Sequence, residues 1–585
     1  MAERQEGDVP TAESTIKTVS SAGAVVVEPI ETTRPSSRED ETSQRPSNSN
    51  PEALETEELK HRSKLQVWSI VLALYLVLFI AALDQTIIAT AIPTITSSLR
   101  SASGYTWLGG AYLLATAVAG LLWTKGSDIW GRKPALLGSV VLFAVASLIA
   151  ALAINMRMLI AARALQGVAG GGLFQLTAIT ISDIFSLRER ALYFGLMGGI
   201  WALAGSAGPL IGGAFSELVS WRWCFWINLP VCGLSLALLL LFLDVHNPRT
   251  KLRDGLAAID WFGMFSFLGV SILLLLGLNF GGSVFPWNSA TVICLLVIGA
   301  VMIGLFLYSE KRAKYPLMPL DTFKLLSNNA VILLAIGHSM VNIGAEYYLP
   351  LYFQSVKEAS PLRSGILLLP LTCTAAAADV AAGIVIHRTG RYREIIWLGV
   401  SLMTLGTGLY IYFWTHTPIA QVIGFQIIAG TGTALLFQTP MLAIHSTIPQ
   451  ADVASATASL GFLRALATSV SVVVGGVIFQ NSMGTRQDEL ARAGITGDLL
   501  DQFSSDKAAA NVEQVKTLTE PAQRDAVEAA YAYSIRNIFI FYTCLAGLTM
   551  LASVFIKQGH MSKEHTETKT GVDNMIKREK EVGTS

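Results

Sequence analysis

The 585-residue chain contains little charge. Only 14% of its residues are Asp, Glu, Lys or Arg, whereas 52% are hydrophobic, and the mean hydropathy is +0.51. A water-soluble fold of this length cannot hide so much apolar surface. Lipid must therefore be part of its solvent, and we expect an integral membrane protein.

Several chemical signatures are also missing. Positive and negative side chains balance at 42 each, and no basic block stands out, which argues against nucleic acid as a partner. The five cysteines show neither a disulfide framework nor metal-ligand spacing. Because no Walker loop, catalytic triad or metal cluster is evident, we expect neither an enzyme nor an ATP-driven pump, and no cofactor. The first ten residues lack an apolar core, so no cleavable signal peptide is expected.

What the sequence does contain is a series of fourteen continuous apolar runs. A helix needs about 20 apolar residues to cross a hydrocarbon core about 30 Å thick, and it satisfies its own backbone within lipid. Continuous runs, as opposed to short alternating strands, exclude a β-barrel. We therefore predict an all-α membrane protein whose spans lie at approximately 67–91, 104–124, 135–154, 158–182, 191–214, 224–243, 261–280, 290–308, 330–353, 365–386, 395–414, 419–440, 455–480 and 536–556.

Orientation follows from the ends and loops of the chain. Residues 1–64 are rich in Ser, Thr, Glu and Pro, a composition that cannot offset the ordering entropy of folding, so we predict a disordered tail. With this tail in the cytoplasm, most basic loop residues fall on the same side, and the positive-inside rule places both termini in the cytosol. We expect a monomer in the plasma membrane, with the vacuolar membrane as the alternative. The stretch 481–535 is then external, either a solvated loop with short helices or a substrate-sensing lid.

An internal repeat divides the chain. Gly167, Phe174 and Gln175 in the fourth span match Gly430, Phe437 and Gln438 in the twelfth, at one constant offset. Parallel repeats of this kind are a transporter architecture with the binding site at mid-depth between the halves. We predict two pseudo-symmetric six-helix halves at 65–244 and 326–557, two inserted spans within 245–325, and a cytoplasmic tail at 558–585.

The loop after the second span carries an acid and several bases at a membrane face. It reads Lys-Gly-Ser-Asp-Ile-Trp-Gly-Arg-Lys over 125–133, with Asp128, Gly131 and Arg132 around a sharp glycine turn. Such a cluster can pair with neighbouring helix ends in one conformation and release them in another, which makes it a candidate gate. The alternative is a basic membrane anchor with an incidental acid.

Three ionisable residues lie deep in the predicted spans. An arginine at mid-membrane costs about 2.5–3.5 kcal/mol on insertion scales, so Arg163 needs a partner or a cavity. With a rise of 1.5 Å per residue, Asp84 lies about 25 Å and Arg163 about 22 Å from the cytosolic face, so the two can share one level; Glu346, in the counterpart of the first span, lies at about 24 Å. Asp84 either exchanges protons or only balances the arginine.

The fifth span contains Gly208, Pro209, Gly212 and Gly213 within a run of small residues. Proline removes one backbone hydrogen bond and small residues permit close helix approach. The pattern predicts a kinked, tightly packed gate, with helix packing alone as the alternative.

Together these segments resemble the major facilitator superfamily, and specifically its fourteen-spanner drug:proton antiporter family as found in fungi. The run Trp-Arg-Trp-Cys-Phe-Trp-Ile-Asn-Leu-Pro at 221–230 is similar to that family's sixth-span signature, and the likeness covers roughly 65–557. The resemblance implies that the loop with Asp128 and Arg132 controls alternating access, that Arg163 assists proton transfer, and that the Gly208-Pro209 helix is associated with antiport. Thr124 and Gly126 depart from the family's loop, which usually begins Gly-x-Leu.

The second half differs in its polar residues. Gln426 stands in the place of Arg163, and Ser471-Val472 in the place of Gly208-Pro209. Asp379 and Arg464 either form an ion pair or face a substrate cavity, and His338 is either a hydrogen-bonded interior residue or a proton relay. Our candidates for the substrate cavity are Gln175, Gln426, Gln438, Tyr347, Asp379 and Arg464; those for proton coupling are Asp84, Arg163 and Glu346.

The function expected from these observations is proton-coupled efflux, or antiport, of small organic compounds such as drugs, mycotoxins or other secondary metabolites, driven by the proton gradient. One alternative is a proton-coupled importer of a nutrient or siderophore, and another is a non-transporting receptor or scaffold. The Gly208-Pro209 motif favours export. The cost of burying ionisable residues in a membrane argues against a scaffold.

Overall fold

A computed structural model describes residues 63–576, apart from short gaps at 100–103, 247, 249, 283–284, 319, 505–506, 509–510, 566–567, 569 and 575. The predicted N-terminal tail, 1–64, therefore lies almost entirely outside the described residues. Fourteen helical segments of the described chain are long and apolar enough to cross a membrane, and that part of the chain contains no strand. The predicted all-α architecture with fourteen spans is confirmed.

The first six spans are built from seven helices. The sixth span is broken after its first turn, so that α6 and α7 together cross the membrane. Tight packing of small residues joins neighbours: a Cβ at Gly167 of α4 would fall 2.3 Å from the carbonyl oxygen of Tyr112 in α2. The elements are α1 (Lys64–Ser98), α2 (Gly104–Trp130), α3 (Arg132–Ala151), α4 (Met156–Ile184), α5 (Leu187–Leu218), α6 (Trp223–Trp226) and α7 (Asn228–Phe242).

The remaining helices follow the predicted order. Two spans, α9 (Trp261–Phe280) and α10 (Ala290–Arg312), pack on each other after the short α8 (Leu252–Ala257). Many large apolar side chains of α10 are exposed, as expected for a helix whose outer face meets lipid. The last six spans comprise α11 (Leu326–Ser355), α12 (Pro361–Thr389), α13 (Arg393–Leu409), α14 (Ile419–Leu435) with α15 (Thr439–His445), α16 (Val453–Gly484) and α19 (Pro521–Ser553).

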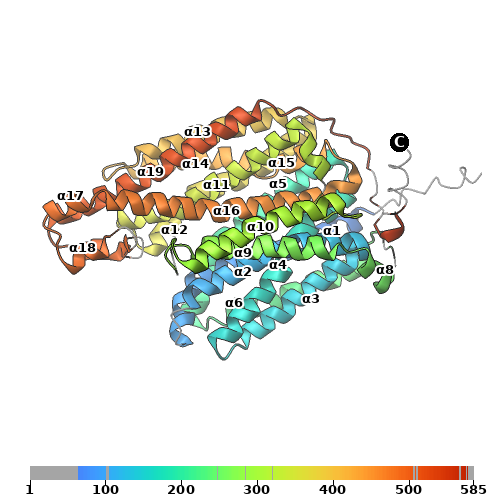
Figure 1. Cartoon of the computed structure of the whole chain (residues 1–585), viewed down its shortest axis with the longest axis horizontal. Helices are drawn as coiled ribbons and strands as arrows, with labels where there is room; N and C mark the ends of the chain where they lie inside the picture. The colour runs from blue at the N-terminus through green and yellow to red at the C-terminus, as the bar shows by residue number, and fades with distance from the viewer. Residues whose placement is uncertain are drawn as a thin grey trace, which may run out of the picture. The chain divides into compact units, whose positions relative to one another are not determined.

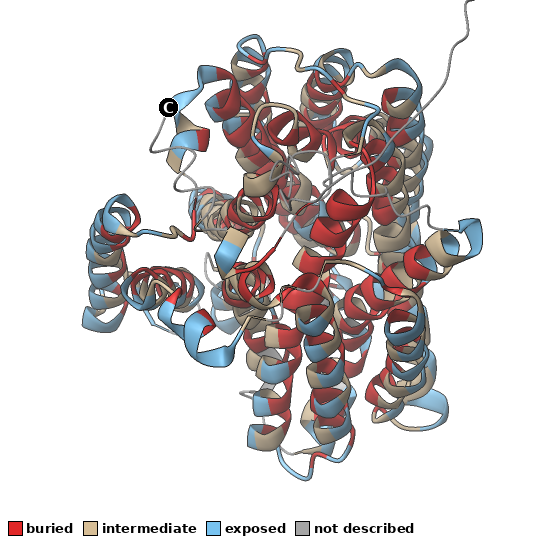
Figure 2. Cartoon of the chain, turned by 90° about the vertical axis from the view of Figure 1, so that its right-hand side faces the viewer, coloured by how far each residue is buried: buried red, intermediate tan, exposed pale blue. Residues whose placement is uncertain are grey.

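The two ends of the helix bundle differ. We call the end with the α2–α3 loop and α8 the Asp128 end, and the end with α17 (Gln487–Arg492) and α18 (Asp498–Gln502) the α18 end. In Figure 1 the α18 end lies at the left and α8 at the right. Seen from the Asp128 end in Figure 2, buried residues line the faces that the helices turn toward one another, and exposed residues lie on the outer faces.

The segment between the last two spans is shorter than predicted. The stretch expected as a loop, 481–535, is helical at both ends, since α16 continues to Gly484 and α19 begins at Pro521. Proline is well suited to the first helical position, and a buried stripe through Val527 and Tyr531 holds this early part of α19 in place. The linking residues, with α17 and α18, bury apolar side chains that continue the main hydrophobic core, namely Leu490, Ile495, Phe503, Ala508 and Val515.

The described residues after α19 lie across the Asp128 end, and we call residues 556–565, 568 and 570–574 the C-terminal strap. On one side, the backbone N–H of Gly559 donates to the hydroxyl of Tyr392, 2.6 Å away. Further along, the N–H of Arg188 donates to the carbonyl of Ser562 at 3.2 Å, and the N–H of Gly571 donates to the carbonyl of Asp128 at 2.8 Å. The strap therefore contacts both six-helix halves.

Candidate functional site

Asp84 and Arg163 form a buried ion pair between α1 and α4. The guanidinium of Arg163 donates to one carboxylate oxygen of Asp84, and both side chains are at most 1% exposed. Arg163 also donates through Nε to the carbonyl of Leu108 at 3.1 Å, and its guanidinium carbon lies 4.4 Å from the ring centroid of Tyr112. The equal depth inferred from the sequence thus corresponds to a direct contact.

Two amide side chains complete the partners of Asp84. Gln166 Nε2 and Asn228 Nδ2 donate to its second oxygen, at 3.0 and 2.8 Å. Both amides also donate to the hydroxyl of Ser147 on α3, at 2.9 and 3.1 Å. Three side chains thus donate to one carboxylate, and the network joins α1, α3, α4 and α7 within one half.

The α5 motif lies against α1. A Cβ on Gly208 would fall 2.1 Å from the hydroxyl of Thr86, and one on Gly212 would fall 2.1 Å from the carbonyl of Ile87. These two glycines therefore permit a helix approach that any larger residue would block. Thr90 donates to the carbonyl of Pro209 at 3.2 Å, which ties the proline turn to α1. Gly213 differs from the prediction of tight packing, because nothing lies within 4 Å of its Cβ position.

The α2–α3 loop forms a second buried charge cluster. Arg132 donates to Asp128 Oδ1 at 2.5 Å and to Asp183 Oδ2, near the end of α4, at 2.7 Å. It also donates to the hydroxyl of Ser127 at 2.5 Å. Gly131 has φ +100°, which side-chain-bearing residues rarely adopt, so glycine is needed at this turn.

The two halves are bonded to each other at the Asp128 end. Arg190 of α5 donates to the side-chain oxygen of Gln450 at 2.7 Å, and Gln450 donates to the carbonyl of Ser182 at 3.2 Å. The side chain of Arg188 donates to the carbonyls of His387 and Arg388, just before α12 ends. Because Ser182 adjoins Asp183, the hydrogen bond from Gln450 to Ser182 is one residue from the Arg132 cluster.

Helices α5 and α12, from different halves, pack closely near this end. A Cβ on Gly195 of α5 would fall 3.1 Å from the Cα of Gly383 of α12, and a Cβ on Gly383 would lie equally close to Gly195. Almost three turns further along α5, Gly205 has nothing within 4 Å of its Cβ position, and neither does Gly365 near the other end of α12. The two helices are therefore in close contact toward the Asp128 end, whereas Gly205 and Gly365 do not pack closely on a neighbour.

The structure separates the acids and bases of the second half. Glu346 is exposed on α11 and accepts from Asn342 at 2.8 Å, unlike buried Asp84. Tyr347 is 57% exposed. Arg464 donates to the hydroxyl of Ser339 at 3.1 Å and to the carbonyl of Phe437 at 3.0 Å. Of the two alternatives for Asp379 and Arg464, the ion pair is absent among the described residues.

The glutamines predicted to line a cavity lie in different surroundings. Gln175 sits between Gly120 of α2 and Gly461 of α16, where it helps to close the contact between the halves. Gln426 is fully buried and neither of its amide atoms has a hydrogen-bond partner. Gln438 is 8% exposed, and its side-chain oxygen also has no partner. His338 Nε2 lies 2.9 Å from the carbonyl of Thr433, as expected for a hydrogen-bonded interior residue.

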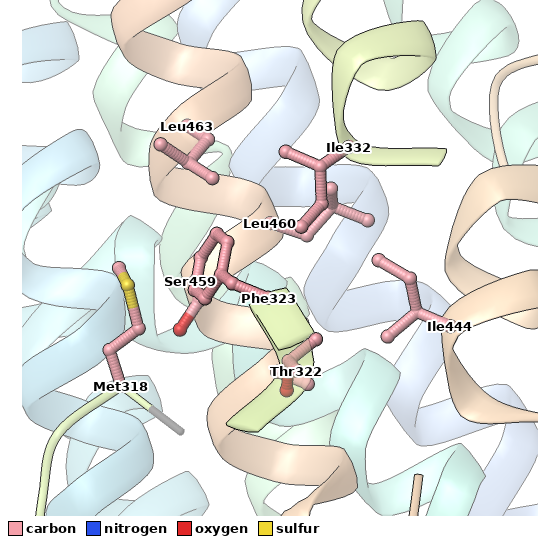
Figure 3. A pocket seen from close by; sticks show the side chains of 9 residues that line it. Met318, Thr322, Phe323, Ile332, Ile444, Ser459, Leu460 and Leu463 are labelled. Carbon is pink, nitrogen blue, oxygen red and sulfur yellow. The ribbon is translucent and has the colours of Figure 1, made fainter. Parts of the chain in front are cut away.

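An apolar pocket near the Asp128 end lies apart from all of these residues. Figure 3 shows side chains from the α10–α11 connection, α11, α15 and α16 around it. Its lining is almost entirely aliphatic, with two hydroxyls and no charged group, so it offers no proton site. The lining residues are Met318, Thr322, Phe323, Ile332, Ile444, Ala456, Ser459, Leu460 and Leu463.

The fold and the paired halves define a membrane transporter. Residues 74–258 and 253–472 match the family model described as Major Facilitator Superfamily, and the chain belongs to that family. It is 42% identical over 511 residues to the efflux pump dotC of Dothistroma septosporum (strain NZE10 / CBS 128990), with 87% of each chain covered. It is 42% identical over 512 residues to the MFS-type transporter ppz2 of Metarhizium majus (strain ARSEF 297), covering 87% of this chain and 88% of that one. The solved human organic anion transporter MFSD10 shares the fold, with a TM-score of 0.51 and 14% identity over 82% of this chain and 99% of its own.

Sequence reasoning missed several residues of these clusters. Asn228 lies within the 221–230 run but was assigned no role, and Gln166 was not singled out, although it follows Arg163 by three residues and so shares its helix face. Asp183 is the one acid near the end of the fourth span closest to Arg132. An acid at that depth beside a basic loop is the signal that could have identified it.

Proposed function

We propose that this transporter exports small organic compounds, such as drugs, mycotoxins or other secondary metabolites, across the plasma membrane in exchange for protons. The relative named an efflux pump supports the export direction, since it aligns along most of both chains. Protons are the coupling ion in this proposal because ionisable side chains are buried deep in the spans, where they are costly unless they serve transport.

The observation that carries this proposal is the close packing of α5 on α12 toward the Asp128 end, where small residues join the two halves. A transporter that works by alternating access needs two such states, in which its halves close at opposite ends around a central site. Hydrogen bonds of Arg190 and Gln450 hold the present state at the Asp128 end. Breaking them is the first step required to reach the opposite state.

The basic residues support an orientation. Lys125, Arg132, Arg188 and Arg190 gather at the Asp128 end, and the positive-inside rule favours such an end on the cytosolic side. We therefore propose that both termini are cytosolic and that this conformation opens to the outside. The Arg132 cluster then acts as the gating element, because it fixes the end of α4 beside the bonds that join the halves.

Asp84, Arg163 and Glu346 are the residues proposed for proton coupling. In this conformation the Asp84 carboxylate is fully buried and fully paired, so a proton reaches it only if the network rearranges. Glu346 is exposed in the same conformation and is the corresponding acid of the second half.

The test is transport in a host that lacks its own exporters, with a panel of fluorescent organic dyes and antifungal compounds as probes. Cells that express the chain should accumulate at least one probe less than control cells, and an uncoupler that collapses the proton gradient should abolish this difference. A probe that accumulates more in expressing cells, in a gradient-dependent manner, would instead indicate import. Expression without any gradient-dependent change across the panel counts against the proposal.

A further inference from the structure

Asp379 lies in the closed part of the α5–α12 interface. It belongs to α12 in the second half, yet its carboxylate points at α5 of the first half: a Cβ on Gly198 would fall 1.4 Å from Asp379 Oδ2. Its backbone carbonyl also packs on α5, 2.7 Å from the Cβ position of Gly195. The side chain is thus enclosed by a contact between the two halves.

This carboxylate is poorly compensated. Asp379 is 4% exposed, and Oδ2 has no hydrogen-bond partner. On α5 it lies against Gly198, which has no side chain to offer a hydrogen bond. The charged group that acts on it is Arg464 of α16, whose guanidinium donates to Ser339 and Phe437 and forms no ion pair with Asp379. A buried carboxylate without adequate partners is unfavourable when ionised, so its enclosure favours the protonated form.

We infer that Asp379 binds the transported proton while the halves are closed at the Asp128 end and releases it when they separate there. This inference rests on the proposed proton-coupled export and names a coupling residue for it. Separation of α5 from α12 removes Gly198 from the carboxyl group and admits water, so the ionised form becomes favourable. The proton passes from the carboxyl oxygen to water, and the carboxylate left behind is stabilised by hydration and by Arg464.

The direction of proton movement then follows from the orientation proposed above. In the outward-open state the enclosed Asp379 has its higher proton affinity and holds the proton. In the inward-open state its affinity falls and the proton leaves to the cytosol. Asp84 is less suited to this task, because its carboxylate has three partners from a single half, and those partners need not part when the halves move.

The experiment measures the separation of the halves and needs no substrate. Fluorophores attached through non-natural amino acids at Lys64 and Arg391, both exposed at the Asp128 end of different halves, report the distance in lipid nanodiscs from pH 5 to pH 8. A tenfold difference in proton affinity between two conformations changes their ratio by up to about tenfold. We expect wild type to shift toward the separated state as pH rises, and Asp379→Asn, a neutral mimic, to stay closed at every pH.

The matched control is Glu394→Gln, which makes the same chemical change at a half-exposed carboxylate and should keep the wild-type pH response. An unchanged pH response in Asp379→Asn, or none in wild type, would overturn the inference. The proposed function has a separate test, because probe efflux that depends on the proton gradient can be present in wild type whatever Asp379 does. Retained gradient-driven efflux in Asp379→Asn would therefore exclude Asp379 as the proton-binding residue and leave the antiport proposal intact.

A second pair of variants tests the geometry. Gly198→Ala should push the Asp379 carboxyl aside and favour the separated state even at pH 5. Gly205→Ala on the same helix should not, since nothing lies within 4 Å of its Cβ position. In an Asp379→Ala background the effect of Gly198→Ala should shrink, because the nearest remaining atom, the Asp379 Cβ, lies 3.2 Å away. Equal effects of Gly198→Ala in both backgrounds would contradict the enclosure of this carboxyl.

Discussion

Replacing Asp84 should destabilise the protein through the arginine that it leaves behind. Asp84→Asn keeps the size of the side chain, but the buried Arg163 guanidinium then loses its counter-charge. Removing one partner of a buried ion pair typically costs about 3–5 kcal/mol, because an uncompensated charge remains in a medium of low dielectric constant. Most of the effect of this variant on activity would therefore reflect folding.

A second substitution separates the two effects. The internal repeat has Gln426 at the position that corresponds to Arg163, so a glutamine is compatible with this place in the architecture. Asp84→Asn/Arg163→Gln removes both charges, and we expect it to recover most of the stability lost in Asp84→Asn. Contacts of Arg163 with Leu108 and Tyr112 are also lost, so recovery should be incomplete.

The assay is thermal unfolding of wild type, both single variants and the double variant in the same detergent, compared at one heating rate because unfolding of such proteins is generally irreversible. Both single variants should melt well below wild type, with the double variant between them and wild type. If Asp84→Asn melts like wild type, or if the two substitutions are simply additive, the ion pair does not hold these helices as described. Gradient-driven efflux by the folded double variant would show that the proton site lies elsewhere.

Three further outcomes are expected. Arg132→Ala should insert normally but lose most transport, because it releases Asp128 and Asp183 together. Surface expression measures insertion and probe efflux measures transport, and normal efflux would exclude a gating role. Pro209→Ala should slow efflux more than it lowers thermal stability, since the proline shapes a moving helix; the reverse pattern would mark it as structural. Gly212→Ala should lower the melting temperature, whereas Gly213→Ala should be tolerated, because only the first glycine lies against α1; similar melting of both would refute the close approach.

The sequence was informative wherever hydropathy or helical rise decides the outcome. Fourteen spans follow from continuous apolar length, and the common level of Asp84 and Arg163 follows from counting residues along two helices. The exposure of Glu346 could not be predicted by counting residues, because the depth of a residue along a helix does not determine which neighbour its side chain faces.

Contacts between helices distant in sequence were harder to predict. Asp379 meets Gly198 only because α5 and α12 cross at small residues, and no local pattern links positions so far apart in the chain. The orphaned amide of Gln426 was equally hidden, since burial and missing partners are properties of the packed bundle. The early start of α19 was missed because residues 521–535 are too polar to be recognised as part of a span, although an apolar stripe buries them on one side.

The C-terminal strap sets a limit on how far the halves can travel. Gly559 bonds Tyr392 of the second half and Ser562 bonds Arg188 of the first half, and these two strap residues are three apart in the sequence. Three residues reach at most about 10 Å when fully extended. While both hydrogen bonds persist, the strap permits the halves to move apart within that reach and resists larger displacements. The amplitude of the motion therefore depends on the number of residues between the two hydrogen bonds.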